Sequence, residues 1–302
     1  MVCGFFAHHS LFSGNNEQDR LKIIEVQVPN LIQSANKLSH FSKKIFPNAQ
    51  MFIATSLIAI NFAPGTNLIN INEDLQAVAF LSKEPKKEIL WAIKGPIKKT
   101  KFLSDDLERK NIYVAKIKDE VILTNSKDLS QNDPNILLSN FQMKRNQSDE
   151  DLTISANPGL FSVLADNYKF QNSELDIVSE QFSNCLIKLN ISNEELEIKF
   201  NILPKANSIF EKELKLRNNN KLSLKEVIDI YLQIFAKKND DLSAKKFLDG
   251  ISLSLSPFFK KAISFKDIEK IFITSFNIDN STLHGVIKID RKQMLLLLGE
   301  KH

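Results

Sequence analysis

Near the start of this sequence, a period-two alternation of apolar residues changes to helical spacing at a proline. Residues 22–28 alternate Ile24, Val26 and Val28 with polar neighbours, which is typical of a half-buried strand. Pro29 follows, and its fixed φ suits the first turn of a helix. The apolar residues after it are spaced for one helix face, at Leu31, Ala35, Leu38 and Phe41. The pattern predicts a strand, a sharp turn and an amphipathic helix.

The same device recurs at the middle of the chain. Residues 152–161 run through Pro158, and placing Pro158 over Pro29 puts Leu160 on Leu31. A helix is expected after both prolines. The two strands differ in phase by one residue, so both an internal repeat and an independent origin stay open.

Pairs of short apolar runs, each separated by turn residues, predict hairpins. They are residues 76–81 with 88–93, 112–117 with 121–123, 185–191 with 196–203, and 271–278 with 283–289. A further strand is expected at residues 251–255. Helices are expected at residues 97–107, after a break at Gly95-Pro96, and at 127–141, 206–216, 222–236 and 291–298. The uncharged run at 51–62 is too short to cross a membrane and predicts a buried core helix.

Together these segments predict an α+β fold in which antiparallel or mixed sheets pack against helices. A polar linker at residues 144–150 divides the elements into two similar modules. We expect the first α+β module at residues 20–143. The second, at 151–302, carries a C-terminal helix and hairpin extension.

Composition supports a globular protein. Of the 302 residues 43% are hydrophobic and 25% are charged, whereas disordered chains combine few apolar residues with high net charge. The net charge of +4 is too small to indicate nucleic-acid binding. Lysine is concentrated at residues 83–118 and acidic residues at 149–180. These segments are either a docking face for an anionic partner or ordinary solvated surface.

The first residues have half of the pattern of a secretory signal. The run 1–7 is apolar and small residues follow at Ser10 and Ser13, but the basic beginning of a signal peptide is missing. Residues 1–19 are therefore either a signal-peptide remnant or a disordered tail. The first interpretation predicts export to the periplasm or cell envelope, and the second a cytoplasmic protein. No run is long enough for a transmembrane helix.

The sequence shows no catalytic constellation. It contains no phosphate-binding glycine loop, nucleophile elbow or zinc-binding helix motif, and its eight glycines are scattered. Cys3 and Cys185 form no metal-binding pair. The five histidines are dispersed, at His8, His9, His40, His284 and His302. We therefore expect no catalytic residue, no bound metal and no cofactor.

One short segment suits contact with a partner. Phe258 and Phe259 follow a proline and precede Lys260 and Lys261. Apolar side chains beside basic ones favour a membrane surface or a protein partner. We take these four residues as the candidate ligand- or partner-binding site.

Three stretches carry a family resemblance: residues 26–31 around Pro29, residues 77–80, and residues 112–114 with the hairpin that follows. Over residues 20–215 the chain resembles uncharacterised exported bacterial proteins of the domain-of-unknown-function type, which have tandem modules of strand, proline, helix and β-meander. The resemblance implies export through a signal peptide and assigns no activity.

Three functions follow as hypotheses. The first is a non-enzymatic exported protein that binds or scaffolds a partner at the cell envelope. The second is a binder of lipid or another apolar ligand, which requires an apolar cavity between sheet and helix. The third is a hydrolase with dispersed site residues, which requires a buried carboxylate near His40 or His284.

Overall fold

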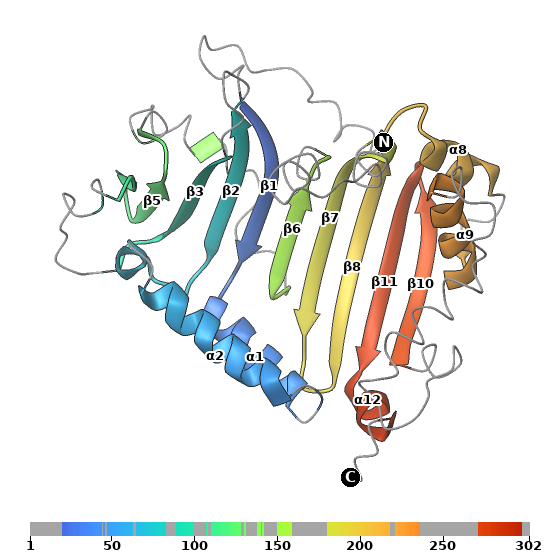
Figure 1. Cartoon of the computed structure of the whole chain (residues 1–302), viewed down its shortest axis with the longest axis horizontal. Helices are drawn as coiled ribbons and strands as arrows, with labels where there is room; N and C mark the ends of the chain where they lie inside the picture. The colour runs from blue at the N-terminus through green and yellow to red at the C-terminus, as the bar shows by residue number, and fades with distance from the viewer. Residues whose placement is uncertain are drawn as a thin grey trace, which may run out of the picture.

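A computed structural model of the chain has a broad, curved sheet with helices at its edges (Figure 1). The structure describes residues 20–43, 45, 47–62, 65–82, 89–98, 107, 110–127, 130, 138–139, 141, 150–158, 180–217, 221–235 and 271–297. Within these residues the sheet has 11 strands in the order β4-β5-β3-β2-β1-β6-β7-β8-β11-β10-β9. The strands are β1 (Arg20–Val28), β2 (Leu75–Ser82), β3 (Ile89–Pro96), β4 (Tyr113–Ile117), β5 (Glu120–Thr124), β6 (Leu152–Ala156), β7 (Phe182–Ile191), β8 (Glu195–Pro204), β9 (Lys221–Leu222), β10 (Phe272–Asp279) and β11 (Thr282–Asp290).

The two halves of the chain form the two halves of this sheet. They meet at β1 and β6, which pair antiparallel with Val26 opposite Ile154. Outward from this pair the order β1-β2-β3-β5-β4 on one side has the same topology as β6-β7-β8-β11-β10 on the other. The α+β class is confirmed, and the described strands of both halves form one continuous sheet. The division into modules 20–143 and 151–302 stays a prediction.

All four predicted hairpins are present as antiparallel pairs: β2 with β3, β4 with β5, β7 with β8, and β10 with β11. The last turn is shorter than expected. Asn280 and Ser281 both have positive φ, of 48° and 61°, which is the geometry of a two-residue turn that matches strand twist.

Strand register separates the side chains into two faces, because residues directly opposite one another point the same way. One face, here named the apolar face, includes the row Val26, Ile154, Ile187, Phe200 and Gly285. The other, named the polar face, includes the row Gln27, Thr153, Lys188 and Lys199. The same register continues the polar face into the first half through Gln76 and Lys94.

The described core clusters follow this division. In the first half both faces carry one, around Phe80 and Ile122 on the polar face and around Val121 and Leu123 on the apolar face. In the second half the described clusters lie on the apolar face alone. One gathers around Phe276 and the other around Ile191.

Helix α1 (Leu31–Ser42) joins the halves. It begins after Asn30, whose side-chain oxygen accepts a hydrogen bond from the Gln33 N–H at 2.8 Å. Pro29 therefore precedes the cap and is not the first helical residue. Phe41, at the far end of α1, packs in the cluster of Ile191 and Met294. Met294 belongs to the last helix, α12 (Arg291–Leu297), as predicted at 291–298.

Helix α2 (Pro47–Phe62) confirms the predicted helix but corrects its burial. It was expected in the core, whereas Met51 is 67% exposed and Ile58 is 56% exposed. The helix packs on α1 and on the short 3-10 helix η1 (Thr66–Leu68), so these contacts cover only one of its sides. Its uniformly apolar sequence did not reveal which side this would be.

The predicted break at Gly95-Pro96 is wrong. Both residues lie within β3, and Ile97, expected to start a helix, forms a bridge with Ile69 instead. Gly95 tolerates no side chain here, since a Cβ would lie 2.6 Å from Ile69. Most of the predicted helices 97–107 and 127–141 and the whole strand 251–255 lie outside the described residues.

Candidate functional site

The predicted partner site lies outside the part of the chain that the structure describes. This applies to Phe258, Phe259, Lys260 and Lys261, and also to the N-terminal segment 1–19. In the described part of the chain no helix is both long and apolar enough to cross a membrane.

The two described histidines, His284 and His40, lie on different elements of the fold, β11 and α1. His284 Nδ1 lies 2.7 Å from Asn201 Oδ1 on the polar face. His40 is exposed on α1 and lines an open hollow whose other polar residues are mainly asparagines. Among the described residues no group of three or more His, Cys, Asp or Glu is placed to hold a metal ion.

Cys185 is a half-buried thiol on β7. Burial raises its pKa above the ordinary value, because a low-polarity environment disfavours the thiolate. The thiolate is the nucleophilic form of cysteine, so this environment makes the residue less reactive.

The most distinctive hollow lies on the apolar face, between two helices and the sheet. It has a volume of about 220 Å³. We name it the apolar pocket and define it by its lining residues: Gln181, Phe182, Ile202, Phe210, Val227, Ile230, Tyr231, Ile234 and Leu283. No charged side chain is among them.

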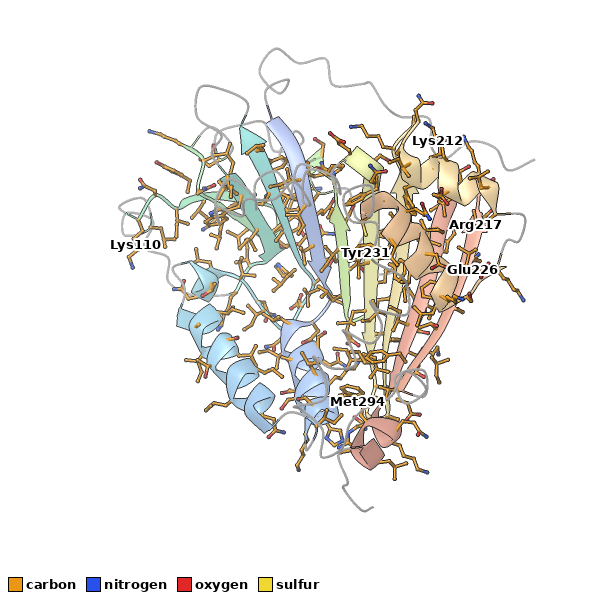
Figure 2. All side chains as sticks on the ribbon, turned by 45° about the vertical axis from the view of Figure 1, so that its right-hand side comes forward. Lys110, Lys212, Arg217, Glu226, Tyr231 and Met294 are labelled. Carbon is orange, nitrogen blue, oxygen red and sulfur yellow. The ribbon has the colours of Figure 1, made fainter. Side chains whose placement is uncertain are left out.

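Helix α9 (Leu224–Phe235) supplies one wall. Val227, Ile230, Tyr231 and Ile234 recur at the spacing of one helix face, so they all reach the pocket. Figure 2 shows Tyr231 and Glu226 on different sides of this helix. Helix α9 confirms the helix expected at residues 222–236.

The start of α9 is fixed by a capping box. The Ser223 side chain accepts from the Glu226 N–H at 3.2 Å, and the Glu226 carboxylate accepts from the Ser223 N–H at 2.7 Å. These bonds to Ser223 lower the pKa of Glu226, since they favour its charged form. The wall of the pocket is thereby held at its first turn.

The sheet supplies the floor. Ile202 and Leu283 lie directly opposite one another on β8 and β11. Helix α8 (Ile209–Leu216) closes a side with Phe210, which is buried. Gln181 is the main polar group, and its side-chain oxygen already accepts a hydrogen bond from the Phe210 N–H at 3.2 Å. The interior thus offers mainly hydrocarbon to a ligand.

Tyr231 marks the mouth of the pocket. It lines the cavity and is also 44% exposed, whereas Ile230 beside it is 2% exposed. A phenol at such a position has an apolar ring toward the cavity and a hydroxyl that can reach water.

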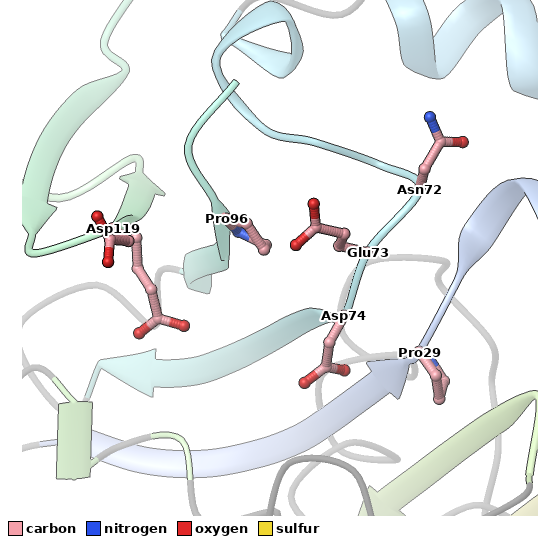
Figure 3. A pocket seen from close by; sticks show the side chains of 7 residues that line it. Pro29, Asn72, Glu73, Asp74, Pro96 and Asp119 are labelled. Atoms are coloured by element: carbon pink, nitrogen blue, oxygen red, sulfur yellow. The ribbon is translucent and has the colours of Figure 1, made fainter. Parts of the chain in front are cut away.

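A second hollow, of about 430 Å³, lies beside the β4–β5 turn, where β1 and β3 end and β2 begins. Its lining is acidic: Glu73, Asp74, Asp119 and Glu120, with Pro29, Asn72 and Pro96. In Figure 3 Pro96 lies between Asp119 and Glu73. The Asp74 carboxylate accepts from the Gln27 amide at 3.1 Å, which ties it to β1.

Ion pairs cross the polar face of the second half. Glu197 lies 2.9 Å from Lys199 and 3.2 Å from Lys288, and Lys288 also reaches Glu195 at 3.0 Å. The hydrogen bond from Lys199 is the main cause that lowers the pKa of Glu197. The carboxylates in turn raise the pKa of Lys199 and Lys288. The lysines and glutamates on this face pair with one another, so together they do not form a patch of a single charge.

Sequence reasoning found α9 but not the pocket. Val227 and Tyr231 belong to the helix expected at residues 222–236, while Phe182, Ile202 and Leu283 come from strands elsewhere in the sequence.

No known family model matches the sequence, and none of the curated proteins matches it. A solved structure of TP0453, crystal form I, aligns with 92% of this chain and 94% of its own length, at 7% identity and a TM-score of 0.33. At this TM-score the likeness transfers neither ligand nor activity.

Proposed function

We propose that this chain is a non-enzymatic binding protein that holds an apolar ligand in the apolar pocket. The observation that carries the proposal is the lining, in which aliphatic and aromatic side chains from α9, α8 and the sheet surround a cavity with no charged group. Sites for small apolar molecules are concave and mainly hydrophobic, with few polar groups.

The volume limits the ligand. A cavity of about 150 Å³ lined by aliphatic side chains admits benzene, and this pocket is larger, at about 220 Å³. It suits a ring system or a short acyl chain. At about 0.8 kcal/mol for each buried CH₂, an eight-carbon chain gains roughly 6 kcal/mol before the entropic cost of association. We therefore expect weak affinity for the chain alone and more from a ligand that also contacts Tyr231 at the mouth.

The chemistry of the lining favours binding over catalysis. General acid–base catalysis needs a titratable group within hydrogen-bond reach of the substrate. Among the described lining residues only Tyr231 has an acidic or basic side chain, a phenol, and it lies at the mouth.

We further propose export to the cell envelope and an origin by duplication. The apolar residues 1–7 support the first. The matching strand orders on the two sides of the β1–β6 pair support the second. Mass spectrometry of the native protein, which reads both the processed N-terminus and any bound lipid, tests export. An unprocessed N-terminus in a cytoplasmic fraction would contradict it. An envelope scaffold for a protein partner is the alternative function.

The pocket is tested with N-phenyl-1-naphthylamine, an uncharged probe whose fluorescence rises in apolar surroundings. We expect saturable binding to the full chain and displacement by octanoate. Val227→Phe fills the cavity and should weaken binding at least tenfold. Val286→Phe is the matched control, because Val286 is also half-buried but lies on the polar face, opposite Lys199.

Wild-type affinity for the probe in Val227→Phe, with unchanged thermal unfolding, would show that the probe binds elsewhere. Absence of saturable binding to the wild-type chain would contradict the proposal directly.

A further inference from the structure

Helix α2 presents an apolar stripe to solvent. Met51, Ala54, Thr55, Ile58 and Ala59 are all exposed, and they lie at the spacing of one helix face. The other side of the helix meets α1, and its C-terminal end meets η1. Figure 1 shows α1 and α2 together along one end of the sheet. The stripe is therefore a surface, although its composition is that of a core.

The composition of α2 is unusual for an exposed helix. None of its 16 residues is Asp, Glu, Lys or Arg. Surface helices of globular proteins ordinarily carry charged residues on the solvent side. A water-exposed face without them, bearing large side chains at Met51 and Ile58, has chemistry suited to an apolar environment.

The length of α2 decides how it could meet a membrane. Sixteen residues span about 24 Å, which is less than the roughly 30 Å hydrocarbon thickness of a bilayer. The helix is also fixed along one side to α1. It can lie in the interface of a bilayer but cannot cross it.

A second copy of the chain fits this stripe less well. A strip about 24 Å long and about 10 Å wide covers roughly 240 Å², whereas a stable protein interface buries about 800 Å² on each partner. A bilayer needs no complementary shape. The area therefore favours lipid over a symmetric helix pair.

Basic residues lie beyond both ends of α2. Lys43 is exposed just before the helix. Lys98 is exposed beside η1, where its N–H donates to the Leu68 carbonyl at 2.7 Å. Lysines that flank an apolar face can contact lipid phosphates. Glu73, exposed on the loop after η1, opposes them, so apolar insertion is the main contribution.

We propose that α2 docks the protein on the surface of a lipid bilayer. The helix lies in the plane of the membrane, with Met51 and Ile58 inserted at the headgroup boundary and Lys43 and Lys98 toward the phosphates. This surface is distinct from the apolar pocket, and neither proposal depends on the other.

Co-sedimentation of the full chain with phosphatidylcholine vesicles tests the proposal. We expect wild-type protein to bind, and replacement of a third of the lipid by phosphatidylglycerol to strengthen binding by a few fold. The double variant Met51→Glu, Ile58→Glu should reduce partitioning at least tenfold, because two charges would enter the apolar boundary.

The matched control is Leu216→Glu, Ile273→Glu. Leu216 is 68% exposed on α8 and Ile273 is 54% exposed on β10, close to the 67% and 56% of the α2 residues. This control should bind vesicles like wild type, and both double variants should unfold at the wild-type temperature and bind the naphthylamine probe.

Three results would overturn the inference. They are no wild-type binding to either vesicle, an equal loss in the two double variants, or a concentration-dependent dimer that only the α2 variant abolishes. If the wild-type protein bound vesicles but not the naphthylamine probe, the result would contradict the apolar pocket instead.

Discussion

Phe200 and Gly285 lie directly opposite one another on β8 and β11, and the Phe200 ring occupies the space where a side chain on Gly285 would lie. A Cβ at Gly285 would clash with Phe200 Cζ. The ring also packs against Phe276, with 6.0 Å between ring centroids. Glycine here makes room for an aromatic side chain in the cluster beside the apolar pocket.

Gly285→Ala should therefore destabilise the protein by about 1–3 kcal/mol, the usual cost of overpacking. Urea unfolding followed by circular dichroism measures this. Adding Phe200→Leu to Gly285→Ala should recover part of the loss, since it removes the clashing ring. A double variant less stable than either single one would show that the contact does not explain the glycine.

Asp151 ties α1 to the centre of the sheet. It is buried, and its carboxylate accepts from Lys37 Nζ at 2.8 Å and from the Ile191 N–H at 2.7 Å. Asp151→Ala leaves a buried N–H without this acceptor and should cost roughly 2–4 kcal/mol of unfolding free energy. Asp119→Ala, at an exposed turn, is the control and should cost less than about 0.5 kcal/mol. Similar losses in the two variants would contradict this role.

The ion pairs of Glu197 predict an acid-sensitive contribution to stability. Lys199 and Lys288 hold the pKa of Glu197 below its ordinary value of 4.5. The contribution is therefore complete above pH 4.5 and is lost as the pH falls through the lower folded pKa. Thermal unfolding from pH 7 to pH 3 should show a smaller loss of stability in Glu197→Gln than in wild type. Glu194→Gln, at the exposed β7–β8 turn, should follow the wild-type curve, and identical curves for all three proteins would refute the prediction.

Ser208 begins α8 beside the apolar pocket. Its hydroxyl accepts from the Glu211 N–H at 3.0 Å, and the Glu211 carboxylate returns the bond to the Asn207 N–H at 2.7 Å. Ser208→Ala should cost about 1 kcal/mol, and Ser208→Asp should keep most of the stability. Denaturant midpoints compare the two. An aspartate variant no more stable than the alanine variant would argue against capping.

Elements whose partners are close in the sequence were predictable. The β4–β5 hairpin needs only two alternating runs and a turn at Lys118, whose positive φ of 54° closes it. The β10–β11 hairpin is of the same kind. Alternation and turn residues specify such pairs locally, so no knowledge of the rest of the chain is needed.

Pairing between distant segments was not predictable. Val26 lies opposite Ile154 because the two halves complete each other's sheet, and no local pattern encodes that choice. The prediction that Met51 is buried was wrong for the same reason. A uniformly apolar helix has no periodic signal to show which side is covered, and the cover here is α1.

The candidate site was predictable only in part. The face of α9 that contains Val227 and Tyr231 is evident from helical spacing. Leu283 reaches the same cavity only because β11 pairs with β8, across about eighty residues of chain. The cavity forms only when these distant segments pack together, so it has no sequence pattern of its own.

The packing of α1 against α12 also sets the order in which the protein can mature. The Arg291 guanidinium donates to the Phe41 carbonyl at 3.1 Å, across a sequence separation of 250 residues. During synthesis on the ribosome, the C-terminal end of α1 is made early. Its contacts with β10, β11 and α12 form only after those elements have been synthesised. Such long-range closure slows folding. A nascent or C-terminally shortened chain would therefore leave Phe41 without the part of its cluster that α12 supplies, Met294 and Leu295.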